Sequence, residues 1–172
     1  MGTMCGFQSE IIVSEKENMN TVYAHDMLLG AMKEHELVIG QLYKVYARLF
    51  PEYCDFWNDL SNEEELHAQA IDVLNDNIKN SEVDFMFDRF PIAAIETSIK
   101  YIRQLIERAK QPDLPLVTAL SLAVDIEKSL LENRYFEIFE GDSPKTKHAL
   151  TLLESGTQKH LKMVQQMLQN IK

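Results

Sequence analysis

The sequence is poor in cysteine and in basic residues, and each shortage excludes a class of protein. Its two cysteines, Cys5 and Cys54, stand far apart and no Cys-x-x-Cys pair occurs, which excludes a zinc knot and a rubredoxin-type iron centre. We expect both to be reduced thiols. Seventeen lysines and arginines stand against 27 aspartates and glutamates, so the net charge is −10. That charge argues against binding nucleic acid or an anionic membrane surface.

Long apolar runs are also lacking. No stretch approaches the length of a membrane span, and the start MGTMCGFQSE lacks the charged-then-apolar layout of a signal peptide. We therefore expect no membrane contact and a cytoplasmic location. At 172 residues with 45% hydrophobic residues, the chain is long enough to bury the core of one ordinary domain.

Apolar residues at helical spacing predict an all-α fold. Residues 1–20 carry little pattern and are expected to form an N-terminal lead-in, before a bundle domain over residues 21–172. The first helix should run from about Thr21 to Phe50. Pro51 follows and suits the first turn of a second, antiparallel helix that ends near Asn80.

The next segment, residues 81–114, has a different residue pattern and forms a long connection between the second and third long helices. It contains a shorter amphipathic helix from Ile92 to about Lys110, and we expect it to cross from one end of the bundle to the other on the outside. A third long helix is predicted from about Pro115 to Glu140. The fourth begins at Pro144, after Gly141 and the capping residue Ser143. Three aromatic residues of the crossover are candidates for a dimer contact: Phe85, Phe87 and Phe90.

Ionisable residues interrupt the apolar stripes of all four long helices. Glu64 and His67 lie on one face of the second helix, among Trp57, Leu60, Ala68, Ile71 and Leu74. A buried carboxylate needs a charged partner or a metal. A single Glu-x-x-His pair is common on solvated helices, so the stronger observation is a second inward set. Glu36 on the first helix, Glu127 on the third and His160 on the fourth complete it.

Four features of the sequence belong together: Glu36 with Tyr43, the run FWNDLSNEEELHA, the stretch DIEKSLLENRYFE and the ending TQKH. Jointly they resemble the rubrerythrin branch of the ferritin-like di-iron carboxylate proteins. The resemblance covers roughly residues 21–170. It implies a ferritin-like four-helix bundle with two irons per chain, bridged by Glu64. The metal ligands and the residues of the chemistry would be Glu36, Glu64, His67, Glu127 and His160. Mixed carboxylate and imidazole ligands also suit manganese or zinc.

Two positions depart from the family pattern. Thr157 stands where the family has the second bridging glutamate, so three carboxylates would leave two divalent metals at about plus one, and a single metal at about minus one. Glu154 is a candidate substitute, and Glu132 a poorer one. Val124 stands where rubrerythrins carry an additional carboxylate linked to their peroxide chemistry.

Three functions are compatible with this pattern. The first is a di-iron oxidoreductase that reduces peroxide or dioxygen and takes electrons from a separate donor protein, because the rubredoxin domain is missing. The second is a non-catalytic metal-binding protein for iron storage or sensing, with a site reduced by Thr157. The third is a bundle that only scaffolds a partner. The resemblance implies a homodimer.

Several tyrosines and polar residues near the apolar stripes are not ligand candidates. Tyr43 and Tyr135 are expected one or two turns from the site, with core packing as the favoured role and orientation of ligands as the other. Five further polar residues are assigned to solvated faces: His25, His35, His148, Glu63 and Glu65.

Overall fold

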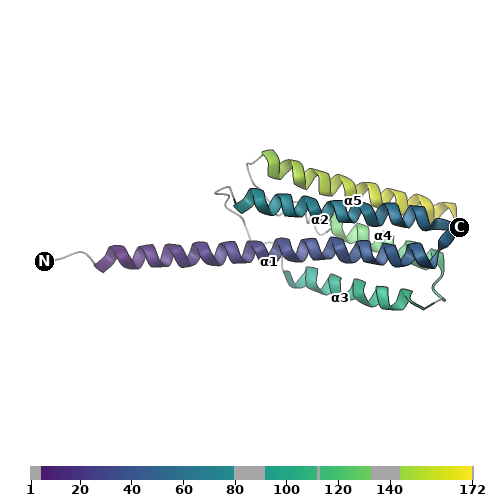
Figure 1. Cartoon of the computed structure of the whole chain (residues 1–172), viewed down its shortest axis with the longest axis horizontal. Helices are drawn as coiled ribbons and strands as arrows, with labels where there is room; N and C mark the ends of the chain where they lie inside the picture. Colours follow the sequence, from purple (N-terminus) through teal and green to yellow (C-terminus); the bar gives the residue numbers. More distant parts are fainter. Residues whose placement is uncertain (1–4, 80–91, 112, 133–143, 172) are drawn as a thin grey trace.

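The computed structural model describes the backbone of residues 5–79, 92–111, 113–132 and 144–171, and most of its side chains from residue 25 onward. These residues form an all-α bundle, as the sequence predicts. The helices are α1 (Cys5–Leu49), a 3-10 turn (Pro51–Tyr53), α2 (Cys54–Lys79), α3 (Ile92–Ala109), α4 (Leu116–Glu132) and α5 (Pro144–Asn170). Figure 1 shows α2 running back along α1, and α4 and α5 lying beside this pair.

The turn between α1 and α2 lies where the sequence places it. Phe50, with φ −121° and ψ 76°, lies outside the helical region, which the residue before a proline avoids. Pro51 then starts the 3-10 turn, and the amide of Tyr53 donates to the carbonyl of Phe50 at 2.9 Å. This tight reversal sets α2 antiparallel to α1.

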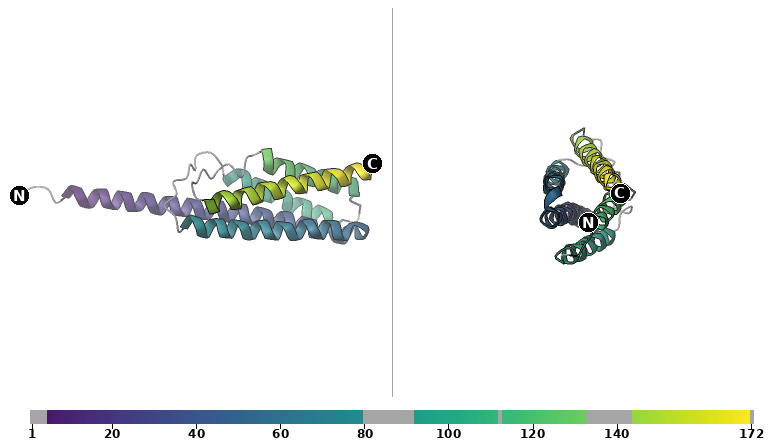
Figure 2. Two further views of the ribbon diagram at one scale, coloured as in Figure 1. Left: turned by 90° about the horizontal axis from the view of Figure 1, so that it is seen from above. Right: turned by 90° about the vertical axis from the view of Figure 1, so that its right-hand side faces the viewer.

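The crossover helix packs on the outside of the bundle, as predicted. α3 lies against α1 (Figures 1 and 2), and its buried residues Ile95, Ile99 and Ile102 follow one face at helical spacing. It carries the chain back along the bundle, so that α4 starts at the opposite end from the one where α2 stops. Its observed bounds agree with the predicted helix from Ile92 to Lys110 to within one residue.

One predicted helix boundary differs in the structure, and another falls outside the described residues. α1 begins at Cys5 rather than near Thr21, and its first half extends beyond the other helices in Figure 1. No proline interrupts the backbone of residues 5–20, so the helix continues although the apolar residues form no stripe there. The predicted end of the third helix at Glu140 and the three crossover phenylalanines, Phe85, Phe87 and Phe90, fall outside the described residues.

The core is aromatic at one end of the α1–α2 pair. Trp57 is fully buried, with its ring centroid 4.9 Å from Tyr46 and 5.5 Å from Tyr43. Gly40 allows α1 and α2 to approach closely beside this cluster, since a Cβ there would lie 3.2 Å from Cβ of Glu64. The close approach places Glu64 deep between the two helices.

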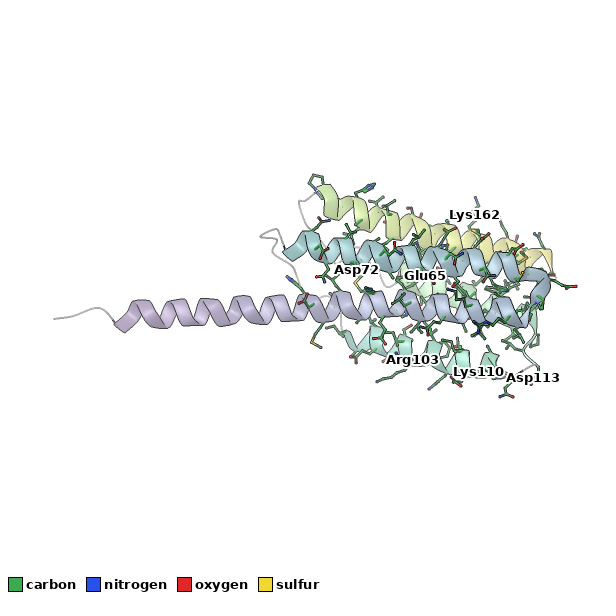
Figure 3. All side chains as sticks on the ribbon, in the orientation of Figure 1. Glu65, Asp72, Arg103, Lys110, Asp113 and Lys162 are labelled. Atoms are coloured by element: carbon green, nitrogen blue, oxygen red, sulfur yellow. The ribbon has the colours of Figure 1, made fainter. Side chains whose placement is uncertain are left out.

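Charged side chains occupy the outer faces (Figure 3). Asp72 and Glu65 on α2 pair with Lys33 and Lys44 of α1, each at 2.6 Å, and Arg103 of α3 pairs with Glu34. Such exposed pairs contribute little stability. Across the described ranges, we find no helix both long and apolar enough to traverse a bilayer.

Candidate metal centre

Four helices bring the five predicted ligands into one buried cluster. Glu36 comes from α1, Glu64 and His67 from α2, Glu127 from α4 and His160 from α5. The exposed fractions are 2% for Glu36, 1% for Glu64, 8% for His67, and 0% for Glu127 and His160. The inward placement predicted from helical spacing is therefore correct for all five.

Glu64 lies at the centre of the cluster and contacts a histidine with each carboxylate oxygen. Its Oε2 is 2.9 Å from Nδ1 of His67, and its Oε1 is 3.0 Å from Nδ1 of His160. The two imidazoles stack with centroids 4.9 Å apart and an interplanar angle of 28°. The carboxylate thus contacts both imidazoles, with one oxygen facing Nδ1 of each.

The other two carboxylates complete two similar halves. Oε2 of Glu36 is 3.4 Å from Nδ1 of His67, and Oε1 of Glu127 is 3.8 Å from Nδ1 of His160. Both distances exceed a good hydrogen bond. Within the described part of the chain, Oε2 of Glu36 and Oε2 of Glu127 are buried without a hydrogen-bond partner. Each half therefore offers two carboxylates and one imidazole, counting Glu64 in both.

This set of donors fits a divalent metal. One ligand atom each from Glu64, His67 and His160 lies within 4.8 Å of the others. Buried carboxylate oxygens without partners are costly, and a metal ion offsets that cost. Oxygen and imidazole nitrogen ligands suit iron, manganese or zinc. Histidine Nδ1 atoms and carboxylate oxygens facing one another make the cluster a candidate metal centre.

Burial and hydrogen bonding together set the charges on α2 in the absence of a metal. Burial opposes the ionisation of Glu64, but hydrogen bonds from His160 and His67 outweigh it and lower its pKa to about 2. Burial also disfavours the imidazolium of His67, yet its interactions with Glu36 and Glu64 raise its pKa to about 10. At neutral pH the pair is therefore Glu64 carboxylate and His67 imidazolium.

The pKa values of the two outer carboxyls, Glu36 and Glu127, are raised instead. Burial raises the pKa of Glu36 to about 8, although the nearby imidazole of His67, 3.4 Å away, lowers it in part. Burial, followed by the negative charge of Glu64, raises the pKa of Glu127 well above its usual range. Burial therefore favours the protonated form of both acids. A metal would have to displace these protons.

Tyr43 contacts the site directly. Its hydroxyl donates to Oε1 of Glu127 at 2.6 Å, and both groups are fully buried. Core packing, the role favoured from the sequence, is only part of its role, because this hydrogen bond also orients a candidate ligand. Tyr135, the other tyrosine expected near the site, falls outside the described residues.

Glu63 was assigned to a solvated face, and that assignment is wrong in part. Its side chain is 29% exposed, but Oε2 lies 3.1 Å from Nε2 of His160. Lys159 donates to both oxygens of the same carboxylate, at 2.6 and 2.8 Å. The helical pattern of α2 points Glu63 away from Glu64, and only the packing of α5 brings His160 to it. Glu65 is exposed, as predicted.

Gly156 on α5 is the second residue that the sequence pattern did not identify. A Cβ atom on it would lie 2.2 Å from Nε2 of His67 and 2.9 Å from Cε1. No side chain fits between α5 and the imidazole. Its place directly before the inward Thr157 was the one available signal.

Neither Thr157 nor Glu154 supplies the second bridging carboxylate of the family pattern. Thr157 is buried at 1% exposure, and its hydroxyl donates to the carbonyl of Leu153 on its own helix at 3.1 Å. Glu154, the candidate substitute, is exposed and accepts from Gln158 at 3.2 Å, so it does not reach inward. Val124 is partly buried, and the side chain of Glu132 lies outside the description.

Two of the three histidines assigned to solvent are buried. His35 is 1% exposed, with Nε2 2.8 Å from the hydroxyl of Ser98 on α3, and burial lowers its pKa to about 4. His25 is 8% exposed. For His35 the error arises because α1 packs against α3 as well as α2, so it has a second buried face. His148 is exposed, as predicted.

Comparison with known protein families, with curated proteins and with solved structures finds no match for this chain.

Proposed function

We propose that the protein is a di-iron oxidoreductase that reduces peroxide or dioxygen. The observation that carries the proposal is the position of Glu64, which directs one oxygen to His67 at 2.9 Å and the other to His160 at 3.0 Å. A carboxylate in this position is suited to bridge two metals, each with one imidazole and one further carboxylate. The resemblance to the rubrerythrin branch points to the same residues.

The roles of the chain follow from its contacts. Glu36 and His67 would hold one metal, and Glu127 and His160 the other, with Glu64 between them. Two ferrous ions would supply the electrons that cleave an oxygen–oxygen bond. Burial keeps bulk water from the ligands, and Tyr43 holds the carboxylate of Glu127 through its hydroxyl at 2.6 Å. Because Thr157 supplies no negative charge, an anion from solution would balance the remaining positive charge of the two metals.

The electron supply has to come from elsewhere, because the chain has no Cys-x-x-Cys pair to hold a rubredoxin-type iron. We expect a separate donor protein, and a homodimer as the assembly.

The proposal is tested with the double variant Glu64→Ala, Glu127→Ala. Wild-type protein loaded anaerobically with ferrous iron should bind two irons per chain and change its absorption when peroxide is added. The double variant should bind none, whereas Glu65→Ala, which removes an exposed carboxylate of α2, should match the wild type. Iron uptake by the double variant would refute the assigned site.

One observation favours a second candidate, a non-catalytic metal-binding protein for iron storage or sensing. The Thr157 hydroxyl donates to Leu153 within α5, and so adds no carboxylate between the two halves. A site of this kind would retain one metal and lose the other easily. One redox-inert metal per chain, with no response to peroxide, is the result that would select this function.

A further inference from the structure

The two halves of the cluster are not supported equally by their surroundings. In one half, both terminal ligands have a partner behind them. Tyr43 donates to Glu127 at 2.6 Å, and Glu63 lies 3.1 Å from the far nitrogen of His160. In the other half, the far nitrogen of His67 faces the backbone of Gly156, which offers no side chain. Oε2 of each outer carboxylate is buried without a hydrogen-bond partner among the described residues, so the difference lies in the Tyr43 hydroxyl on Oε1 of Glu127 and in the carboxylate behind His160.

The contact between Glu63 and His160 determines which nitrogen faces the cluster. In the metal-free protein Nδ1 donates to Glu64. A carboxylate beside Nε2 would keep a proton on that nitrogen when a metal takes the place of the proton on Nδ1. Nδ1 of His160 is 3.0 Å from Glu64. The ring is fully buried and cannot turn without breaking both contacts.

Glu63 is itself fixed in place. Lys159 donates to both of its oxygens, at 2.6 and 2.8 Å, from the residue that precedes His160 on α5. The carboxylate thus links α2 to α5 at the surface while its Oε2 contacts the buried imidazole. Its neighbour Glu65 makes a comparable ion pair with Lys44 at 2.6 Å, but on an exposed face.

We infer that Glu63 is a positioning residue for His160, and that the Glu127–His160 half therefore binds its metal first and more tightly than the Glu36–His67 half. The inference rests on the proposed metal centre and goes beyond it by assigning an order to the two metals. Ligands that are already oriented lose less freedom on binding, and a carboxylate behind an imidazole increases its strength as a donor.

The order of filling is measured on protein labelled with ¹⁵N-histidine. One equivalent of Zn²⁺ added to metal-free protein should shift the imidazole nitrogens of His160 before those of His67. A shift of His67 first, or of both equally, would overturn the inference.

The role of Glu63 is measured by titrating metal-free protein with Co²⁺ and following its visible absorption. Glu63→Ala should weaken the first binding step by about 10- to 100-fold. Glu63→Gln should recover part of the loss, because its carbonyl still accepts from Nε2. The matched control Glu65→Ala should leave both steps unchanged. An unchanged first step in Glu63→Ala, or an equal loss in Glu65→Ala, would refute the positioning role.

These outcomes are distinct from failure of the proposed function. If wild-type protein takes up neither Zn²⁺ nor Co²⁺, the metal centre itself is wrong. If it takes up both equivalents and Glu63→Ala binds them as the wild type does, the centre stands and only the role of Glu63 is refuted. Melting curves of the metal-free variants confirm that each is folded.

Discussion

Gly156 of α5 and His67 of α2 lie so close that a Cβ atom on the glycine would sit 2.2 Å from Nε2 of the imidazole. Gly156→Ala must therefore displace the ring or the helix. We expect it to lower the free energy of unfolding by about 1–3 kcal/mol, as overpacking does, and to reduce metal uptake. Urea unfolding and elemental analysis measure both.

Gly30→Ala is the matched control, because nothing lies within 4 Å of a Cβ at that helical position. It should stabilise the protein by about 0.5–1 kcal/mol and leave metal uptake unchanged. Wild-type stability and wild-type metal content in Gly156→Ala would contradict the packing described for His67.

Tyr43→Phe removes the hydroxyl that donates to Glu127 at 2.6 Å. The buried carboxyl then loses its partner, which should cost about 1–3 kcal/mol of stability in metal-free protein. Metal affinity should fall by about 10-fold or more. Tyr46→Phe is the control, since the Tyr46 hydroxyl has no hydrogen-bond partner among the described residues. Equal effects of the two substitutions in calorimetry would show that the hydroxyl of Tyr43 has no special role.

The stability of the metal-free protein should fall as the pH rises from about 6.5 to 8. Below pH 6.5, His35, whose pKa is lowered to about 4 on folding, acts in the opposite direction. Folding raises the pKa of Glu36 from 4.5 to about 8, so between pH 6.5 and 8 the unfolded chain lacks a proton that the folded protein retains. Glu127 acts in the same direction, and His67, with its pKa raised from 6.5 to about 10, adds to the fall above pH 6.5. Each proton of difference gives about 1.4 kcal/mol per pH unit.

Glu64 affects the stability of the metal-free protein at acidic pH instead. Because its pKa falls from 4.5 to about 2 on folding, its contribution is present above pH 4.5 and is lost between those two values. Urea unfolding across the pH range, with Glu36→Gln as the variant that should flatten the upper part, measures these slopes. Metal affinity should show the opposite trend and rise with pH, because binding expels protons. A metal-free stability that rises between pH 6.5 and 8 would contradict the charges assigned to Glu36 and His67.

Thr157→Glu should restore a carboxylate at the position of the missing bridge. The second metal should then be lost more slowly to a chelator, while the metal-free protein should become less stable because a further carboxyl is buried. Thr157→Val removes the hydroxyl without adding charge and serves as the control. Metal retention in Thr157→Glu no better than in Thr157→Val would mean that this side chain does not reach the cluster.

Much of this arrangement could be predicted from the sequence because it depends on local spacing. Pro51 and Pro144 mark helix starts, and the five ligand candidates stand out because ionisable residues interrupt apolar stripes. The early start of α1 could not be seen, because a helix without an apolar stripe has no periodic signal.

The errors concern contacts between helices. His35 lies off the inner stripe of α1 and is buried only because α3 packs on a second face. Glu63 points away from Glu64 on α2, and its contact with His160 joins residues 97 positions apart. Such contacts depend on how helices are placed together, which no pattern within one helix contains. Gly156 belongs to the same class, since only the approach of His67 explains it.

We propose that four helices build a two-metal centre around Glu64, and the number of metals bound per chain measures this. Elemental analysis is made on protein purified without added metal, and again after anaerobic loading with ferrous iron. We predict close to two irons per chain after loading. One iron would select the reduced metal-binding site in place of the oxidoreductase, and none would contradict the metal centre altogether.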